Sequence, residues 1–527
     1  MPLNNDEHIN NAISFISRLN EYNSSNFWWA FTFTAKNPLS STLINNLINI
    51  FKSLYFNNQS SSNNKYSQLK FIQQKGLIEK ISKTTIVIRL FINYIFHLIT
   101  SIFLLIQSFT FCLLSKKRIL DSEILLFSYV DGRHRDNNDS YFGDLIEIIN
   151  KKRPLMKISY LFHVYRPYFK NSGNLINEKN DYNFILSYLK LSDFIFCFTQ
   201  LIKVWNFKIK NSKYKTYNKK IDLKLVIKEA MINEISRGLI DNLLIYRAFL
   251  RISSQDCLKT IIYPFENKSL EKLMLIAINK KINTIGYQHS SITPRHFSLM
   301  LSNQQLKYTP LPSKIVTIGY ITKEWLIKTG KFPENKIYSG VYLRNASYKY
   351  LKKDFDLTNK TKILFSFSSS YKEISQVINF LDNVEALSKM NIKFRFHPDF
   401  PYKRLDEKIK KWINNNKILI SNHTVLDDLK WSDISCYVSS SLAIDSILHN
   451  VPVILIDVDH YDSDPLMRTN LPLKWTINDP KEFYVTITKI LKIDIFERKK
   501  SYYKSKEFID RYLVNKQNLD LNVFLEL

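Results

Sequence analysis

The order of apolar and polar positions alternates between two periods from residue 122 onward. Apolar runs of strand length, such as Lys259–Phe265 and Asn283–Gln288, are separated by stretches with apolar residues at helical spacing, such as Leu270–Lys280. A second series, with shorter connections, begins at Lys362. Strands that alternate with helices predict parallel sheets. We therefore expect an α/β chain with two facing Rossmann-like domains and a cleft between the carboxyl ends of their strands.

The stretch from Ile434 to Asp457 predicts a strand, a turn, a helix and a second strand in that order. The turn holds Ser439, Ser440 and Ser441, and apolar residues at helical spacing follow it. Free backbone N–H groups at a helix N-terminus favour an anion, so the three hydroxyls indicate a phosphate site. The alternative is that these serines only cap the helix. The pattern leaves both interpretations open.

Residues 1–120 contain one long apolar segment, Leu90–Leu114, with basic residues on both sides. Its length is about that of a membrane span, but three polar residues interrupt it. Positive charge on both flanks gives no orientation by the positive-inside rule. Three interpretations remain: a membrane-embedded or interfacial helix or hairpin, a true span, or a buried core helix. We expect an N-terminal helical region that associates with a membrane.

Composition and charge narrow the class of protein. The 527 residues are enough for roughly two to four domains with cores of their own. The net charge is +28, yet no nucleic-acid motif accompanies it, so we expect an anionic membrane face or anionic substrates and no nucleic acid. The four cysteines lie far apart without a CxxC pair or secretory signal. This indicates a reducing cytoplasm, with neither a disulfide framework nor a zinc site.

Loops that follow parallel strands are the usual ligand positions in such folds. In the second series His397, held by Pro398, follows a strand and is placed to donate to a phosphate oxygen; the alternative is a loop histidine without a role. Asp445, one turn into its helix, is a candidate for a ribose hydroxyl or lies on a solvated helix face. The candidate substrate-binding residues of this half are Ser368, Ser369, Pro398, Ser439, Ser440, Ser441 and Asp445.

The first series offers acidic groups and an imidazole at its strand ends. Asp131 follows the first strand, Glu266 stands in YPFEN, and Gln288 and His289 stand in GYQHSS. A transfer to a hydroxyl acceptor needs a base or a charge-stabilising carboxylate that faces the donor phosphate. Asp131, Glu266 and His289 are therefore catalytic candidates beside His397, and Gln288 is a candidate binding residue. Capping or loop roles are open for each.

Three of these motifs together resemble a known family. RFHPDF at 395–400 followed by the serines at 439–441 resembles the HP and SS motifs of bacterial GT-B sialyltransferases and of the Kdo transferases of capsule and lipopolysaccharide. YVDG at 129–132 is similar to their acidic DG motif, with Val130 in place of a second acidic residue. YPFENKSLEK and GYQHSS look like bacterial surface-carbohydrate biosynthesis proteins. The resemblance covers roughly residues 120–495.

The resemblance implies a GT-B fold and a glycosyltransferase that needs no metal or other cofactor. The donor would be a CMP-activated sugar, sialic acid-like or Kdo, and the acceptor a growing surface glycan or glycolipid at the inner face of the cytoplasmic membrane. His397 would serve the CMP phosphate, Ser439 and Ser440 would bind it, and Asp131 would be the base, with Glu266 as the fallback. The alternatives are a UDP- or GDP-sugar enzyme, a polyol-phosphate transferase, or a non-catalytic scaffold in polysaccharide assembly.

These elements divide the chain into three predicted parts. Residues 1–120 form the N-terminal helical region, with the apolar segment at about 90–114. Residues 121–345 form a Rossmann-like acceptor domain. Residues 346–527 form a Rossmann-like nucleotide-sugar domain that ends in helices.

Overall fold

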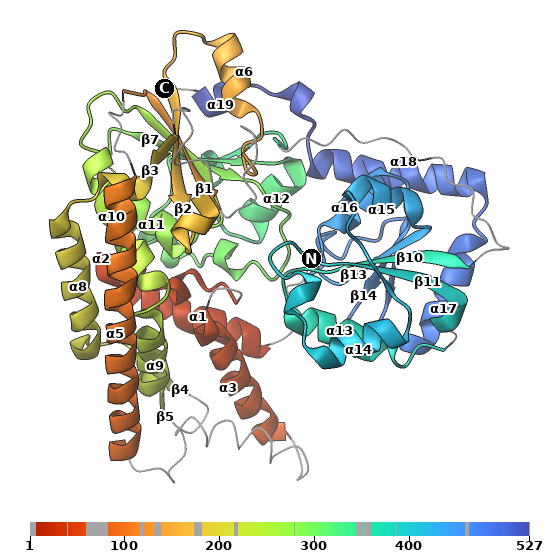
Figure 1. Cartoon of the computed structure of the whole chain (residues 1–527), viewed down its shortest axis with the longest axis horizontal. Coiled ribbons are helices and arrows are strands. Elements are labelled where there is room, and N and C mark those ends of the chain that lie inside the picture. Colours follow the sequence, from red (N-terminus) through yellow and green to blue (C-terminus); the bar gives the residue numbers. More distant parts are fainter. Residues whose placement is uncertain are drawn as a thin grey trace.

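The computed structural model shows two α/β domains side by side, with a group of long helices attached to the first (Figure 1). The structure describes residues 7–38, 41–59, 83–115, 121–130, 139–172, 182–215, 220–278, 280–343, 351, 360–385, 387–458 and 463–525. All statements below refer to these residues. The predicted Asp131 lies outside them.

The first domain is built on a seven-stranded sheet in the order β3-β2-β1-β6-β7-β8-β9, with every neighbouring pair parallel. All seven residues of β1 are buried, as expected for a central strand covered on both faces. The strands are β1 Ile124–Val130, β2 Ile158–Val164, β3 Tyr182–Phe184, β6 Thr260–Pro264, β7 Asn283–Gln288, β8 Lys314–Thr317 and β9 Ile337–Ser339.

Helices flank this sheet, and a small separate hairpin lies near the start of α9 (Figure 1). The helices are α6 Leu145–Lys152, α7 Tyr168–Ser172, α8 Leu191–Asn206, α9 Lys224–Glu234, α10 Gly238–Ile252, α11 Ser269–Ala277 and α12 Tyr320–Lys328. The antiparallel pair β4 Lys213–Lys215 and β5 Lys220–Asp222 forms the hairpin. Residues 235–237 form a turn that separates α9 from α10.

The N-terminal helices are part of the first domain's core. They are α1 Glu7–Tyr22, α2 Asn26–Trp29, the 3-10 turn η1 Thr32–Ala35 and α3 Thr42–Gln59. Trp28 and Trp29 are buried in the same apolar cluster as the central sheet. The carboxylate of Glu234 on α9 accepts hydrogen bonds from the N–H groups of Thr32 at 2.5 Å and Phe33 at 3.1 Å. These bonds fix the N-terminal segment to the domain.

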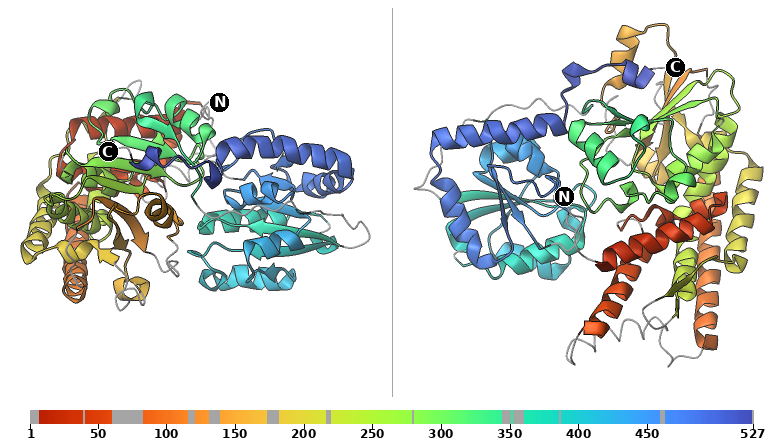
Figure 2. Two further views of the ribbon diagram at one scale, coloured as in Figure 1. Left: turned by 90° about the horizontal axis from the view of Figure 1, so that it is seen from above. Right: turned by 180° about the vertical axis from the view of Figure 1, so that it is seen from behind.

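The predicted apolar segment is one continuous helix, α5 Lys83–Leu114, which excludes the hairpin interpretation. Leu90, Tyr94, Leu105 and Phe111 are buried on its inner side. By length and composition the part Thr84–Leu114 is sufficient to cross a membrane, and only 22% of its most apolar window is buried. It is therefore not a buried core helix. Together with α8 and α9 it lies on the side of the first domain away from the second (Figures 1 and 2).

The second domain is a six-stranded parallel sheet in the order β12-β11-β10-β13-β14-β15. The strands are β10 Thr361–Ser366, β11 Met390–Arg395, β12 Leu419–Ile420, β13 Ile434–Tyr437, β14 Val453–Ile456 and β15 Lys474–Ile477. The helices are α13 Tyr371–Leu381, α14 Glu407–Asn415, α15 Val425–Trp431, α16 Leu442–Leu448 and α17 Pro480–Leu491.

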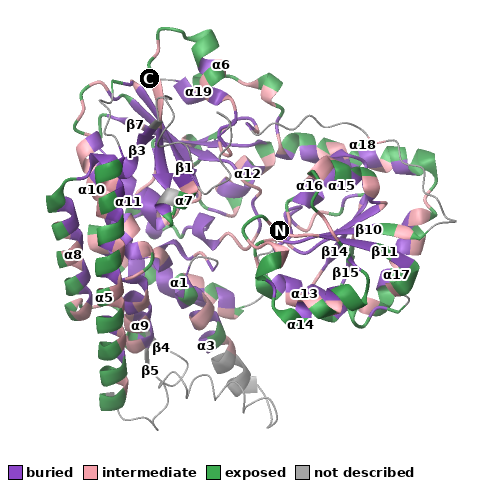
Figure 3. Cartoon of the chain, in the orientation of Figure 1, coloured by how far each residue is buried: buried purple, intermediate pink, exposed green. Residues whose placement is uncertain are grey.

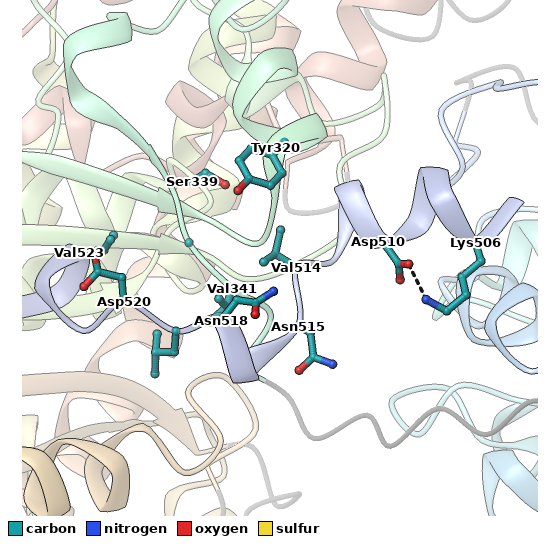
Figure 4. A pocket seen from close by; sticks show the side chains of 12 residues that line it. Tyr320, Ser339, Val341, Lys506, Asp510, Val514, Asn515, Asn518, Asp520 and Val523 are labelled. Atoms are coloured by element: carbon teal, nitrogen blue, oxygen red, sulfur yellow. Dashed lines mark hydrogen bonds and ion pairs between the residues drawn. The ribbon is translucent and has the colours of Figure 1, made fainter. Parts of the chain in front are cut away.

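The chain returns to the first domain at its end. Helix α18, Ile495–Tyr512, packs on α16, and α19, Asn522–Leu525, then packs on the first sheet (Figure 2). At the crossing Gly319 lies so close to the carbonyl of Tyr512 that a β-carbon would not fit between them. A cavity of about 590 Å³ opens beside β9 at this point, with Tyr320 and Ser339 opposite Asp510 (Figure 4). None of the predicted site residues lines it.

Two Rossmann-like domains with an N-terminal helical region confirm the predicted fold class. Each sheet is parallel and carries helices on its faces, as a doubly wound fold requires. The residues after α18 were predicted as part of the second domain because they follow it in the chain. In the structure they complete the core of the first domain. The two domains are thus tied by two chain connections, one before β10 and one after α18.

Candidate functional site

Four neighbouring strands of the first sheet end at one edge and bring together polar and aromatic side chains. The order β2-β1-β6-β7 places His163 beside Tyr129 in register. The residues that follow β6 and β7 are Glu266 and His289. Because carboxyl ends of parallel strands share one edge, residues from separate parts of the sequence meet there.

Glu266 and His289, predicted independently, are in contact. The Nε2 atom of His289 lies 3.4 Å from Oε1 of Glu266, and Nζ of Lys268 lies 2.7 Å from Oε2. The side chain of Glu266 is 26% exposed, whereas that of His289 is 3% exposed. Burial acts to raise the pKa of Glu266, but the charges of Lys268 and His289 outweigh it and lower the pKa to about 2. Glu266 is therefore ionised throughout the physiological range.

The loop that carries Glu266 is held by a second carboxylate. Glu271 on α11 accepts hydrogen bonds from the N–H groups of Glu266 at 3.1 Å and Asn267 at 2.8 Å. Asn267 has a φ of 56°, in the left-handed region that asparagine tolerates, and its side chain donates to the Ser298 carbonyl. Burial raises the pKa of Glu271 to about 8, against the lowering effect of Lys268. This loop thus has one defined shape.

Aromatic rings surround the pair. The Tyr141 ring stacks on His289 with centroids 4.8 Å apart at 17°, and Tyr129 stacks on Tyr165 at 5.6 Å and 14°. The Lys268 ammonium lies 5.8 Å from the centre of the Tyr129 ring. Burial raises the pKa of Tyr129 well above its usual value, so this hydroxyl stays protonated. Tyr129 and His289 are buried, and Tyr165 is the exposed ring of this group.

The loop after β7 connects this edge to the second domain. Gln288 is buried, and its side-chain amide donates to the Ser290 carbonyl, so it shapes the loop. Farther along, Nη1 of Arg295 donates to the Ser463 hydroxyl at 3.3 Å. Ser463 belongs to the region after β14, so strand-end segments of the two sheets touch. The next residue, Asp464, accepts a 2.9 Å hydrogen bond from the Tyr437 hydroxyl at the end of β13.

In the second domain the predicted serines fall into two groups. The N–H and hydroxyl of Ser368 donate to the carboxylate of Glu373 at 2.9 and 2.6 Å, and the Ser439 hydroxyl donates to the same carboxylate. Glu373 therefore braces the ends of β10 and β13 against each other. Ser369 is exposed and lies outside this brace. These bonds give Ser368 and Ser439 a structural function.

Ser440 and Ser441 lie outside that brace. The Ser440 hydroxyl accepts a long, 3.4 Å hydrogen bond from the Leu442 N–H, and Ser441 at the start of α16 makes no side-chain capping bond. Capping therefore accounts for little of this serine turn. Asp445 is half-buried on α16. Whether any of these groups binds a nucleotide stays a prediction.

His397 and Pro398 follow β11 at the same edge of the second sheet. Nδ1 of His397 accepts a hydrogen bond from the Asp399 N–H at 3.1 Å, and the Asp399 carboxylate lies 3.5 Å away. A neutral His397 ring therefore carries its proton on Nε2. His397 is half-buried and Pro398 is exposed. Arg395, in the same RFHP motif, instead binds the buried carboxylate of Asp428 at 2.7 Å.

Glu271 and Glu373, the two carboxylates that hold the strand-end loops, were not predicted from the sequence. Only Glu373 lies in a recognisable sequence pattern. Ser370 and Glu373 are spaced as in a capping box, and the Ser370 hydroxyl does accept from the Glu373 N–H. Glu271 and Lys268 had no comparable pattern. Among the described residues, no group of three or more His, Cys, Asp or Glu side chains is arranged to hold a metal ion.

Comparisons with known proteins add only distant likenesses. No family model matches the chain, and no curated protein matches its sequence. Similar solved structures include the wall teichoic acid polymerase TagF (12% identity, 81% of this chain and 94% of that one, TM-score 0.38). They also include the lipopolysaccharide outer core galactosyltransferase WaaB in its apo form (11%, 76% and 99%, 0.42). A third is the UDP-GlcNAc 2-epimerase of Methanocaldococcus jannaschii (11%, 70% and 93%, 0.40). Likenesses this distant carry no functional argument.

Proposed function

We propose that the chain is a glycosyltransferase that binds an activated sugar on its C-terminal domain and a hydroxyl acceptor on its N-terminal domain. The observation that carries this proposal is the ionised Glu266 in contact with His289 and Lys268 at the strand ends of the first sheet. The contact of Arg295 with Ser463 supports it, because it joins the loop after β7 to the segment after β14 of the second domain. In this proposal the acidic group of the first domain faces the hydroxyl and imidazole donors of the second.

The proposed chemistry is a displacement at the anomeric carbon. The acceptor oxygen forms the new bond, the bond to the donor phosphate breaks, and the nucleotide leaves with both electrons of that bond. Glu266 is the more exposed member of the pair, so it is the group that contacts the acceptor hydroxyl. Glu266 takes the proton of the acceptor hydroxyl as the new bond forms and releases it to water, and the positive charges of Lys268 and His289 keep the carboxylate ionised before the transfer.

On the donor side, Ser440, Ser441 and His397 are proposed to bind the phosphate, with Ser368 and Ser439 supporting the loops. Hydrogen bonds to charged groups each contribute roughly 1.5 to 3 kcal/mol. Asp131 remains the base that the family resemblance implies. Glu266 is proposed in its place because it is an ionised, partly exposed carboxylate in contact with a histidine.

The finer identity rests on the family resemblance. RFHPDF followed by the serine turn supports a CMP-activated donor, sialic acid-like or Kdo, and metal-independent transfer to a surface polysaccharide such as capsule or lipopolysaccharide. The proposed location is the cytoplasm at the inner face of the membrane, supported by the long exposed apolar helix α5. A UDP- or GDP-sugar donor, a polyol phosphate and a scaffold role are the competing proposals that the following experiment separates.

The experiment first measures thermal shifts of the full chain with CMP, CDP, UDP and GDP. A nucleotide that binds the folded state raises the melting temperature as its concentration rises. The sugar donor of the stabilising nucleotide is then assayed with the Glu266→Gln variant. We expect kcat to fall by about 10²- to 10⁴-fold with nucleotide affinity unchanged. Glu324→Gln, at an exposed carboxylate of the same domain, is the matched control and should keep full activity.

Two results would contradict the proposal. Absence of stabilisation by all four nucleotides would favour the scaffold role. Near-normal turnover of Glu266→Gln would remove Glu266 from the chemistry, and parallel loss in Asp131→Asn would then assign the base to Asp131.

A further inference from the structure

Helix α5 has two apolar sides, and only one of them is covered. The inner side packs on the domain through Leu90, Tyr94, Leu105 and Phe111. The outer side exposes a second stripe at the same helical spacing, visible in Figure 3 as a green band along α5. This stripe consists of Ile88, Ile92, Ile95, Ile99, Ile102 and Ile106.

Phenylalanines widen the exposed stripe to about half of the helix. Phe91, Phe96 and Phe103 are exposed beside it, and Phe103 is 68% exposed. Within residues 91–114, all of which the structure describes, the only polar side chains classed as exposed are Gln107 and Thr110. Soluble surfaces rarely carry a contiguous apolar patch of this size without a partner.

Helix α8 continues the exposed apolar face. It runs antiparallel to α5, since Phe194 near its start contacts Phe109 at 5.2 Å and Trp205 near its end contacts Tyr94 at 5.4 Å. Its own outer side exposes Leu191, Ile195 and Ile202. The exposed residues of α5 and α8 therefore form one two-helix surface, here called the apolar platform.

Cations border the apolar platform near both ends of α8. Lys190 precedes the helix, Lys203 lies in its last turn, and Lys208, Lys210 and Lys213 follow; all five are exposed. Between residues 190 and 215, all of which are described, the only acidic residue is Asp193. That carboxylate is buried between Arg247 and Arg251, at 2.8 and 2.6 Å, and adds no negative charge to the rim.

The surroundings of the stripe distinguish a bilayer from a second copy of the chain. A helix that pairs with another helix has a narrow apolar seam flanked by charged or polar positions. Here the flanking positions are phenylalanines, and the charges lie at the ends of the surface. Apolar side chains bordered by cations are what an interface of acyl chains and anionic headgroups fits.

The covered side of α5 decides between lying on a membrane and crossing it. Contacts with the domain run along the helix from Tyr94, whose hydroxyl donates to the Ile202 carbonyl at 3.1 Å, to Phe111, which lies 5.0 Å from Tyr168. Ser108 also bonds the Tyr168 hydroxyl at 2.9 Å. A spanning α5 would break these contacts or draw α8 and α9 into the hydrocarbon, where their polar groups would be unpaired.

We propose that the apolar platform of α5 and α8 lies in the plane of an anionic bilayer, with its isoleucines and phenylalanines in the acyl region and its lysines among the headgroups. This proposal concerns how the protein binds the membrane, and it does not depend on the proposed transfer reaction. The strand-end site would then be held at a fixed height above the bilayer by the rigid first domain.

The first test is flotation of the full chain, without detergent, with vesicles of phosphatidylcholine alone or mixed with phosphatidylglycerol. We expect binding to the mixed vesicles that weakens with salt and is much weaker with phosphatidylcholine alone. Ile99→Gln/Phe103→Gln/Ile106→Gln should reduce binding at least about tenfold, since each removes a buried apolar group. Val485→Gln/Phe496→Gln/Tyr503→Gln changes three exposed apolar residues of α17 and α18 and should bind normally.

Charge is tested separately by Lys203→Gln/Lys208→Gln/Lys210→Gln. Each lysine near an anionic surface contributes roughly fivefold to binding, so the triple variant should lose most of the preference for phosphatidylglycerol. Lys481→Gln/Lys489→Gln/Lys492→Gln, which removes three exposed lysines of the second domain, is the control. Leu191→Gln/Ile195→Gln tests the α8 half of the platform should the α5 variant fail to fold.

A depth measurement separates the two membrane modes. Nitroxide labels at Ile92, Ile102 and Leu113 should report similar depths for an in-plane helix, whereas a spanning helix would place Ile102 deepest. Three outcomes would overturn the proposal. They are a chain that ignores both kinds of vesicle, a depth maximum at Ile102, and a vesicle-independent dimer that the α5 variant dissociates, which would assign the platform to a second copy.

Discussion

At the scale of single residues, two glutamates of the strand-end site differ in their protonation. Glu266 is kept ionised by Lys268 and His289, whereas Glu271, one turn away on α11, is buried without a dominant cation and has its pKa raised to about 8. The same residue type thus serves two purposes within one loop. The ionised carboxylate is the accessible one, and the other accepts backbone N–H groups.

His163 allows a test of this edge that needs no substrate. It lies at the end of β2, 3% exposed, between the rings of Tyr129 and Tyr165, and burial lowers its pKa to about 4. Between pH 6.5 and 4 the unfolded chain takes up a proton that the folded chain refuses. The contribution of His163 to the free energy of unfolding is therefore fully present above pH 6.5. It is lost as the pH drops toward 4, and its size is on the order of 3 kcal/mol.

The measurement is denaturant unfolding of the chain and of His163→Gln at pH 4.5 and 7.5. The variant should be less stable at pH 7.5 because of the lost packing, but its stability should fall less between the two values. His423→Gln, at an exposed histidine of the second domain, should keep the full pH dependence. An identical pH dependence in His163→Gln and the wild type would contradict a neutral buried imidazole.

At the scale of elements, the sequence predicted strands better than the loops between them. β7 was predicted at its observed bounds because its apolar run is short and bounded by polar residues. Glu266 and His289 were predicted separately, each as the residue after a strand. Their contact was not predictable, because it depends on the pairing of β6 with β7, and periodicity does not give strand order. The brace at Glu373 depends on side-chain direction, which pattern alone does not supply.

The two groups of serines give a prediction at this scale. Ser440→Ala/Ser441→Ala should lower affinity for the activating nucleotide at least about tenfold with little change in melting temperature, since these hydroxyls make few internal bonds. Ser439→Ala should instead lower stability by about 1 to 3 kcal/mol, because the Glu373 carboxylate loses a donor. Nucleotide titration and thermal unfolding measure both. If Ser439→Ala weakened nucleotide binding and the Ser440/Ser441 variant lowered stability, Ser439 would be the phosphate ligand and the other two serines would only stabilise the start of α16.

At the scale of the whole molecule, the end of the chain belongs to the first domain although it follows the second. Tyr512 illustrates the connection, since its hydroxyl accepts from the Ile292 N–H at 2.9 Å and its carbonyl lies against Gly319. Val514, Leu521 and Phe524 then enter the core beneath β7 and β8. This return gives the first domain a second connection to the second domain, which precedes the return in the chain. The order of elements in the sequence gives no sign of it, because the last helices read as a continuation of the second domain.

Phe524 tests whether that return stabilises the first domain. Its ring is fully buried and lies 5.8 Å from the ring of Tyr287 in β7, so Phe524→Ala should lower the free energy of unfolding by about 3 to 5 kcal/mol. Phe496→Ala, at a phenylalanine of α18 that is 81% exposed, should change it little. Hydrogen exchange locates the effect: amides of β7 and β8 should lose protection while those of β10 and β13 keep theirs. Loss of protection in the second sheet instead would mean that the C-terminal residues stabilise the domain from which they emerge, and that the return is a surface contact without a part in the first core.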